Sequence, residues 1–158
     1  MTSDIFIQIQ GIDGESQDAD FPKAIDVLHW EFAIEQKTRM HSGSGNGRNK
    51  AFVSDLIFRH ELDRASPNLA AYCFQGKHIP EAKLTMRKAG GAPFHYYRLT
   101  MSDVIITRVW PSVDGPNPIE TVMLCFSRVK QEYLVQNAKG GNMGAVTALI
   151  DLKPDRAA

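Results

Sequence analysis

The segment HSGSGNGRNK, residues 41–50, contains the residue types that proteins use to bind phosphate. Glycines leave the backbone free to curl around an anion, and Arg48 and Lys50 add positive charge. A Walker loop needs Lys and then Ser or Thr after its second glycine, but Arg48 stands five residues after Gly43 and Ala51 follows Lys50. The dinucleotide motif G-x-G-x-x-G before a helix is also not matched, because G-x-G-x-G precedes the strand-like AFVSDLIF. We therefore expect a long connection between strands rather than a nucleotide site.

Other residue types that carry out chemistry are scattered along the chain. The five histidines do not form H-E-x-x-H, since HE at residues 60–61 is followed by LD. A G-x-S-x-G nucleophile motif is also missing from the sequence. Asp18 and Asp20 are interpreted as solvated loop charges, and His29 and Glu31 as ordinary residues of a polar strand face. The sequence predicts no catalytic residue, no metal site and no cofactor, so we expect a protein that is not an enzyme.

Length and composition indicate a single globular domain, residues 1–158, with 43% hydrophobic residues. A net charge of zero argues against a dedicated nucleic-acid binder. No apolar run approaches the roughly 20 residues of a membrane span, and MTSDIFIQIQ lacks the features of a signal peptide. We expect a chain that folds in the cytoplasm without contacting nucleic acid or membrane. Cys73 and Cys125 are expected to be reduced thiols of the core.

The zero net charge conceals an uneven distribution. Residues 1–35 carry eight acidic side chains against one basic side chain, a charge of −7. Residues 36–108 carry twelve basic and five acidic side chains, a charge of +7. The fold could interleave the two segments and cancel the asymmetry. If they lie at opposite ends instead, the molecule is suited to head-to-tail association with its own copies.

The clearest periodic pattern is the alternation in AIDVLHWEFAIEQ, residues 24–36. A period of two is typical of a strand with one buried and one solvated face. We predict one strand whose core face carries Leu28, Trp30, Phe32 and Ile34. Its polar face then carries His29, Glu31, Ala33 and Glu35.

The remaining pattern predicts mostly strands with one helix. Strands are expected at residues 4–10, 51–60, 82–89, 94–110, 120–136 and 145–152, and the two longest should bulge or bend. ASPNLAAYCFQGK predicts a helix with Ser66 as N-cap, Pro67 at the first position and Gly76 at its end. Leu69 and Cys73 should face the core. We expect a mainly β fold, an antiparallel β-barrel, closed or nearly closed, with one short α-helix beside it.

The block SPNLAAYCFQGKHIPEAKLTMRKAGG, residues 66–91, closely resembles the signature of the hemolysin-coregulated protein (Hcp) family. That family forms the inner tube of bacterial type VI secretion systems. The resemblance extends to DIFIQIQGIDGES, AIDVLHWEF and ETVMLCFSRVKQEY, and so covers nearly the whole chain. The sequence departs from the family pattern at Phe32, where members often have Trp, and in a less pure glycine loop.

The resemblance implies a biology that agrees with the missing signal peptide and the missing active site. Similar proteins form a homohexameric ring, and the rings stack into a hollow tube inside a contractile sheath. A valine-glycine repeat spike protein caps the tube, and the assembly is expelled into the extracellular space or a target cell. Family members also hold small secreted effectors in the channel, as receptor and chaperone.

The resemblance also assigns roles to two groups of residues. The glycine-rich segment resembles the loop that couples stacked rings or neighbouring subunits, formed here by His41, Ser42, Gly43, Ser44, Gly45, Asn46, Gly47, Arg48, Asn49 and Lys50. Its acidic complement is expected at Asp13, Glu15, Asp18 or Asp20. The face that would line the channel and contact effectors carries His29, Glu31, Ala33 and Glu35.

Two other functions are also compatible with the sequence. A phage-like tail tube subunit shares the same expected architecture, and a monomeric ligand-binding β-barrel shares the same strand pattern. A catalytic variant would need an added C-terminal toxin domain, for which we expect no room after the last predicted strand.

Overall fold

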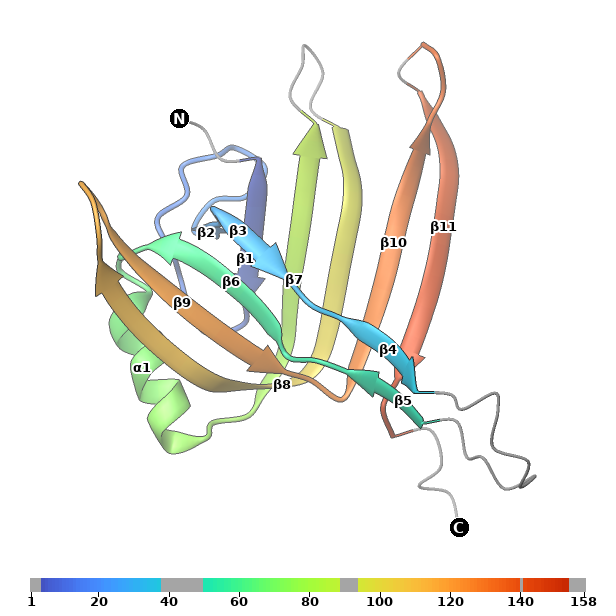
Figure 1. The fold of residues 1–158 in the computed structure, drawn as a ribbon. Helices are drawn as coiled ribbons and strands as arrows, with labels where there is room; N and C mark the ends of the chain where they lie inside the picture. Colours follow the sequence, from blue (N-terminus) through green and yellow to red (C-terminus); the bar gives the residue numbers. More distant parts are fainter. Residues whose placement is uncertain (1–3, 38–49, 89–93, 140, 154–158) are drawn as a thin grey trace, which may run out of the picture.

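The computed structural model describes residues 4–37, 50–88, 94–139 and 141–153 (Figure 1). In these residues strands predominate, and a single helix lies against the sheet. The strands are β1 (Ile5–Ile9), β2 (Ile25–Asp26), β3 (His29–Glu31), β4 (Ile34–Lys37), β5 (Lys50–Val53), β6 (Leu56–Glu61), β7 (Ile79–Lys88), β8 (Phe94–Val113), β9 (Pro118–Cys125), β10 (Arg128–Gln136) and β11 (Asn142–Asp151), and the helix is α1 (Ser66–Gln75).

The strands form one large antiparallel sheet and a separate hairpin. The hydrogen-bonded order is β2-β1-β7-β8-β9-β6-β3, with β10 on β8 and β11 on β10, while β4 pairs with β5. The two end strands, β2 and β3, belong to one continuous segment of chain. Between them Val27 donates a hydrogen bond to the carbonyl of Ile5, and Leu28 donates one to the carbonyl of Arg59. The ends of the sheet are thereby joined, and the predicted mainly β antiparallel fold with a helix beside it is confirmed.

Strand β8 is bent, as its length predicts. Its first half pairs with β7 and β10, and from Ile105 onward it pairs with β9. Asp103 adopts a left-handed φ of 53°, and the register shifts between Ile106 and Arg108. These irregularities let one strand serve both halves of the curved sheet.

Three predicted strands are wrong in their extent, because each is divided in the structure. Residues 120–136 form β9 and β10, residues 51–60 form β5 and β6, and residues 24–36 form β2, β3 and β4. The breaks fall where the chain changes pairing partner. At the last of them, β3 pairs with β6 in the large sheet, whereas β4 leaves to pair with β5.

The core lies inside the curved sheet and under α1. Its largest fully buried side chains are Ile7, Ile25, Leu56, Phe58, Leu69, Ile79, Leu84, Leu99, Met101, Ile106 and Leu124, while Phe6 is buried in a separate cluster with Phe21 and Ala24. Leu69 is the buried anchor of α1, and Tyr72 and Cys73 pack against the same cluster. The predicted core face of the helix is therefore confirmed.

The N-cap of α1 differs from the prediction by one residue. Ala65, not Ser66, occupies the N-cap position. The Ser66 hydroxyl instead accepts a hydrogen bond from the Asp63 N–H, and the Asp63 carboxylate accepts one from Ala65. Gly76 ends the helix at a left-handed φ of 60°, as predicted.

Candidate functional site

The four residues expected to contact effectors all lie on the surface. His29 and Glu31 lie on β3, Glu35 on β4 and Ala33 between the two strands, and each side chain is exposed. His29 Nε2 lies 3.6 Å from Glu31 Oε2, with both side chains at least half exposed. An ion pair this exposed contributes about 0–1 kcal/mol, so these groups stay available to a partner. Their role in effector binding stays a prediction.

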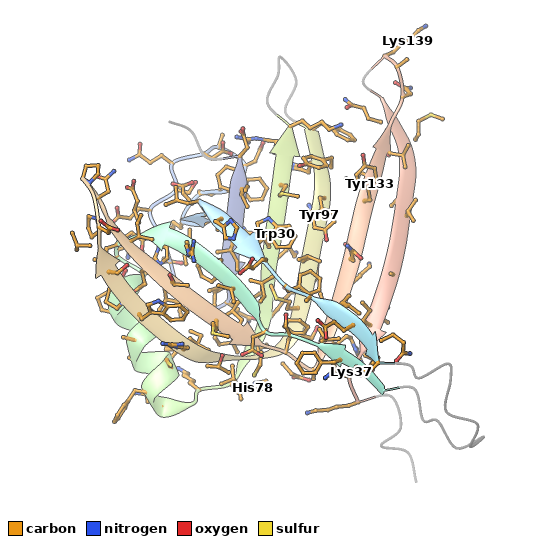
Figure 2. All side chains as sticks on the ribbon, in the orientation of Figure 1. Trp30, Lys37, His78, Tyr97, Tyr133 and Lys139 are labelled. Carbon is orange, nitrogen blue, oxygen red and sulfur yellow. The ribbon has the colours of Figure 1, made fainter. Side chains whose placement is uncertain are left out.

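The opposite face of this segment is only partly buried. Trp30 and Phe32 pack against the core as predicted, and Trp30 stacks on Tyr97 at 5.7 Å (Figure 2). Leu28 and Ile34, which were predicted to be core residues, are 53% and 49% exposed. The prediction is wrong at these two positions because the strand is interrupted on both sides of β3, and β4 leaves the large sheet to pair with β5.

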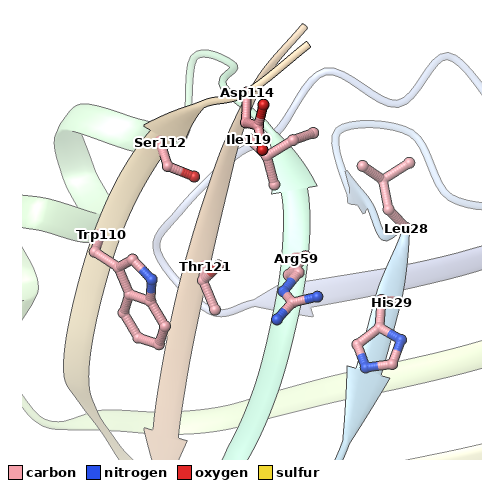
Figure 3. Close-up of a pocket in the computed structure, with 8 residues that line it drawn as sticks. All are labelled: Leu28, His29, Arg59, Trp110, Ser112, Asp114, Ile119 and Thr121. Carbon is pink, nitrogen blue, oxygen red and sulfur yellow. The ribbon is translucent and has the colours of Figure 1, made fainter.

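A groove crosses the outer face of the sheet beside His29. The register places His29 opposite Arg59, Arg59 opposite Thr121, and Thr121 opposite Trp110, so one row of side chains runs across four strands. The groove has a volume of about 440 Å³ and is lined by Leu28, His29, Arg59, Trp110, Ser112, Asp114, Ile119 and Thr121 (Figure 3). Sequence reasoning placed only His29 on this surface and assigned its neighbour Leu28 to the core, while Arg59, Thr121 and Trp110 reach the groove through strand pairing.

A second surface feature is the β10–β11 hairpin. β11 pairs with β10 alone among the described strands, and all its side chains from Asn142 to Leu149 are exposed. Met143, Val146 and Leu149 are more than 60% exposed. In Figure 2 the hairpin extends with Tyr133 on β10 and Lys139 near its tip. An exposed edge strand of this length with apolar side chains is typical of a protein interface.

A buried charged cluster connects β6, β9 and the segment before α1. His60 is fully buried, and its Nε2 lies 2.8 Å from Oε1 of Glu120, which is itself 3% exposed. Its Nδ1 lies 3.7 Å from Asp63 Oδ2, too far for a hydrogen bond but close enough for attraction between charges. Burial alone lowers the pKa of His60, but the two carboxylates outweigh it and raise that pKa to about 9. The two carboxylates therefore favour the protonated form of His60 in the fold.

The acidic loop residues have different environments. Asp18 was predicted to be a solvated loop charge, but it accepts two hydrogen bonds from the Arg87 guanidinium, at 2.9 and 2.6 Å. These bonds hold the pKa of Asp18 below its ordinary value. Glu15 accepts a hydrogen bond from the backbone of Arg64, whereas the side chain of Asp20 is 53% exposed. Of the proposed acidic complement, Asp18 and Glu15 are thus already engaged within the chain, and Asp20 Oδ2 lies 3.7 Å from Arg87 Nη1.

The other predictions from chemistry-bearing residues have these outcomes. Residues 41–49 of the glycine-rich segment lie outside the described residues, and Lys50 begins β5. Cys73 and Cys125 are free and half-buried. In the described ranges, no three His, Cys, Asp or Glu side chains are arranged to hold a metal ion. No helix there has the length and hydropathy needed to cross a membrane.

The fold defines a mainly β protein with one large antiparallel sheet and one helix among the described residues. The chain belongs to the Hcp family: residues 6–133 match the family described as "Type VI secretion system effector, Hcp". It is 40% identical over 147 residues to "Protein hcp1" of Pseudomonas aeruginosa, covering 91% of each chain.

Solved structures agree with this assignment. Hcp1 from Salmonella typhimurium is 47% identical with a TM-score of 0.80, and the match covers 97% of each chain. A type VI secretion system effector from Yersinia pestis is 38% identical with a TM-score of 0.78, and the match covers 94% of this chain and 99% of that one. The family resemblance read from the sequence is thereby confirmed.

Proposed function

We propose that the chain is the tube subunit of a type VI secretion system. Six copies form a ring, the rings stack into a hollow tube inside the contractile sheath, and the tube is expelled with the valine-glycine repeat spike at its end. Small secreted effectors bind inside the channel. Family membership supports this function, and the observation that carries the assembly is the outer edge of β11, with which no other described strand pairs.

The edge of β11 favours association with further copies. A ten-residue outer strand presents a row of backbone N–H and C=O groups to a neighbour. Monomeric proteins normally cover such an edge strand, keep it short or place charged side chains on it. Here the side chains beside that edge include Met143, Val146 and Leu149, which are apolar and exposed. Contact between this edge and a different surface of the next copy is heterologous, and such contacts close into rings when the rotation fits.

The outer face of β3, β6 and β9 supports the carriage of effectors. His29 and Glu31 lie there beside the groove, and they are the residues that the family resemblance assigns to the channel. The monomeric ligand-binding barrel is the alternative function, and it differs in requiring no ring.

The assembly state is the first measurement to make. We expect a native mass of six times 17.6 kDa, about 106 kDa, at micromolar concentration. Val146→Glu is expected to shift this mass to the monomer, because it places a charge in the contact. Native mass spectrometry and light scattering report the change.

Phe74→Glu provides the matched control. Phe74 is 93% exposed on α1, so the substitution introduces the same charge at another exposed apolar position, and the hexamer should persist. A monomeric unmodified chain would show that the ring proposal is wrong. Hexamers of the Val146→Glu variant would place the contact between copies elsewhere than β11.

A further inference from the structure

The groove beside His29 has the dimensions of a short peptide segment. Neighbouring strands in a sheet lie about 4.8 Å apart, so the row from His29 through Arg59 and Thr121 to Trp110 spans about 14 Å. An extended peptide advances about 3.4 Å per residue. The row therefore matches about four residues of peptide lying across the strands.

The groove combines an available cation with an apolar wall. Among the described residues, no carboxylate lies within ion-pairing distance of the exposed Arg59 guanidinium. The Trp110 ring forms one side, with the Arg108 guanidinium 4.1 Å from its centre. Leu28 on the His29 side and Ile119 near Asp114 supply further apolar surface (Figure 3).

The charges of the lining residues indicate the sign of the ligand. Arg59 lies in the middle of the row, and Arg108 adds a second positive charge at the Trp110 end. The one carboxylate among the lining residues, that of Asp114, lies near Ile119 rather than along the row. A carboxylate entering the row meets positive charge, and Arg binds carboxylates through two parallel hydrogen bonds.

We propose that this groove binds a short extended peptide segment in which an acidic side chain lies beside an apolar one. The acidic side chain pairs with Arg59, and the apolar side chain packs on Trp110. This proposal rests on the proposed function in one respect, which is that the peptide belongs to an effector carried in the channel. Peptide binding itself is measurable whatever the assembly state.

Calorimetric titration of the unmodified chain with the peptide acetyl-Glu-Leu-Asp-Leu-amide tests the groove. We expect saturable binding that weakens as salt is added. The neutral peptide acetyl-Gln-Leu-Asn-Leu-amide and the variant Arg59→Gln should each bind at least tenfold more weakly. Arg128→Gln is the matched control, because Arg128 is an exposed arginine on β10 that pairs with Asp151 on β11. This variant should bind the acidic peptide as the unmodified chain does.

Tryptophan fluorescence locates the bound peptide. The chain has two tryptophans, and Trp30 is packed between Tyr97 and Phe32. We expect the acidic peptide to change the emission of the unmodified chain and of Trp30→Phe, but not of Trp110→Phe. An emission change that persists in Trp110→Phe would place the peptide outside the groove.

The possible outcomes distinguish the proposal of a peptide groove from the proposal of a tube subunit. Equal binding of acidic and neutral peptides, unchanged binding by Arg59→Gln, or no binding at all would overturn the groove proposal. A hexamer that fails to bind peptide would leave the tube function standing. A monomer that binds the acidic peptide through Arg59 would support the groove while contradicting the tube.

Discussion

Replacing Glu120 with alanine is expected to lower the free energy of unfolding by about 3–5 kcal/mol. In the unmodified protein the Glu120 carboxylate lies 2.8 Å from the fully buried His60 ring. The substitution removes this carboxylate, and water cannot replace it at a buried position. Removing the closest member of this buried cluster is costly because the desolvated charge of His60 is then compensated only by Asp63, whose Oδ2 lies 3.7 Å from Nδ1. Denaturant unfolding at one fixed protein concentration measures the effect, since assembly adds to the apparent stability.

Two further variants give this result a physical interpretation. Glu61→Ala removes an exposed carboxylate from the adjacent strand β6, where it accepts a hydrogen bond from Asn117, and should cost less than about 1 kcal/mol. The double variant His60→Leu, Glu120→Leu removes both charges and should recover most of the lost stability. If Glu120→Ala and Glu61→Ala cost the same, the buried pair does not stabilise the fold.

The same histidine makes stability depend on pH. Its pKa rises from 6.5 to about 9 on folding, so the folded protein binds the proton more tightly. The stabilisation is fully present below the unfolded pKa and is lost as the pH rises through the folded pKa. We therefore expect stability to fall between pH 6.5 and 9, by roughly 3 kcal/mol. The double leucine variant should lack this decrease, and equal pH profiles would contradict the assignment to His60.

The burial of His60 had a signal in the sequence. Leu56, Phe58 and His60 are spaced two apart, and the alternation that places the first two in the core places the histidine there as well. A lone histidine carries no indication of its partner, however. Glu120 and Asp63 reach it only because β6 pairs with β9 and the chain turns before α1. Local periodicity therefore predicts the face of the strand but not the ion pair.

The errors around β3 have a similar origin. The alternation in residues 24–36 correctly places Trp30 inward and Glu31 outward. It cannot indicate that β4 leaves the large sheet for β5, which exposes Ile34. Tertiary pairing decides where a continuous pattern is divided. The Hcp-like block at residues 66–91 predicted the family correctly. The periodic segments, in contrast, did not predict where their strands end.

Asp18 shows the same limit for a charged side chain. Its partner Arg87 is 69 positions away in the sequence. The two meet because β7 pairs with β1, and Arg87 also lies over the Phe6 ring at 5.1 Å. No local motif distinguishes such a carboxylate from a solvated one. The groove residues Arg59 and Trp110 were missed for this reason too, since strands β6, β9 and β8 bring them together.

Exchanging both Arg48 and Lys50 for glutamate is expected to leave hexamers intact and to abolish tube formation and secretion. β4 and β5 form a hairpin that extends from the large sheet (Figure 1), and the glycine-rich segment connects the two strands where Lys37 pairs with Lys50. Ordering a glycine-rich connection costs about 1–2 kcal/mol for each fixed residue, so a partner surface must offset that cost. Exposed Asp13 offers such a surface, as does Asp20, whose side chain stays 53% exposed despite its 3.7 Å contact with Arg87. Each contact is repeated six times around a ring. Electron microscopy, native mass and a secretion assay measure the three outcomes.

Arg64→Glu with Lys77→Glu is the matched control, since it makes the same change in charge near α1, away from the hairpin. This variant should form rings, tubes and secreted protein normally. High salt should weaken stacking of the unmodified rings, because each exposed pair contributes only about 0–1 kcal/mol and is screened. Loss of the hexamer in the Arg48, Lys50 variant would assign the loop to the contact within one ring. If tubes and secretion both survive, the loop is an inert connection. Stacking would then not require the positive charges of Arg48 and Lys50.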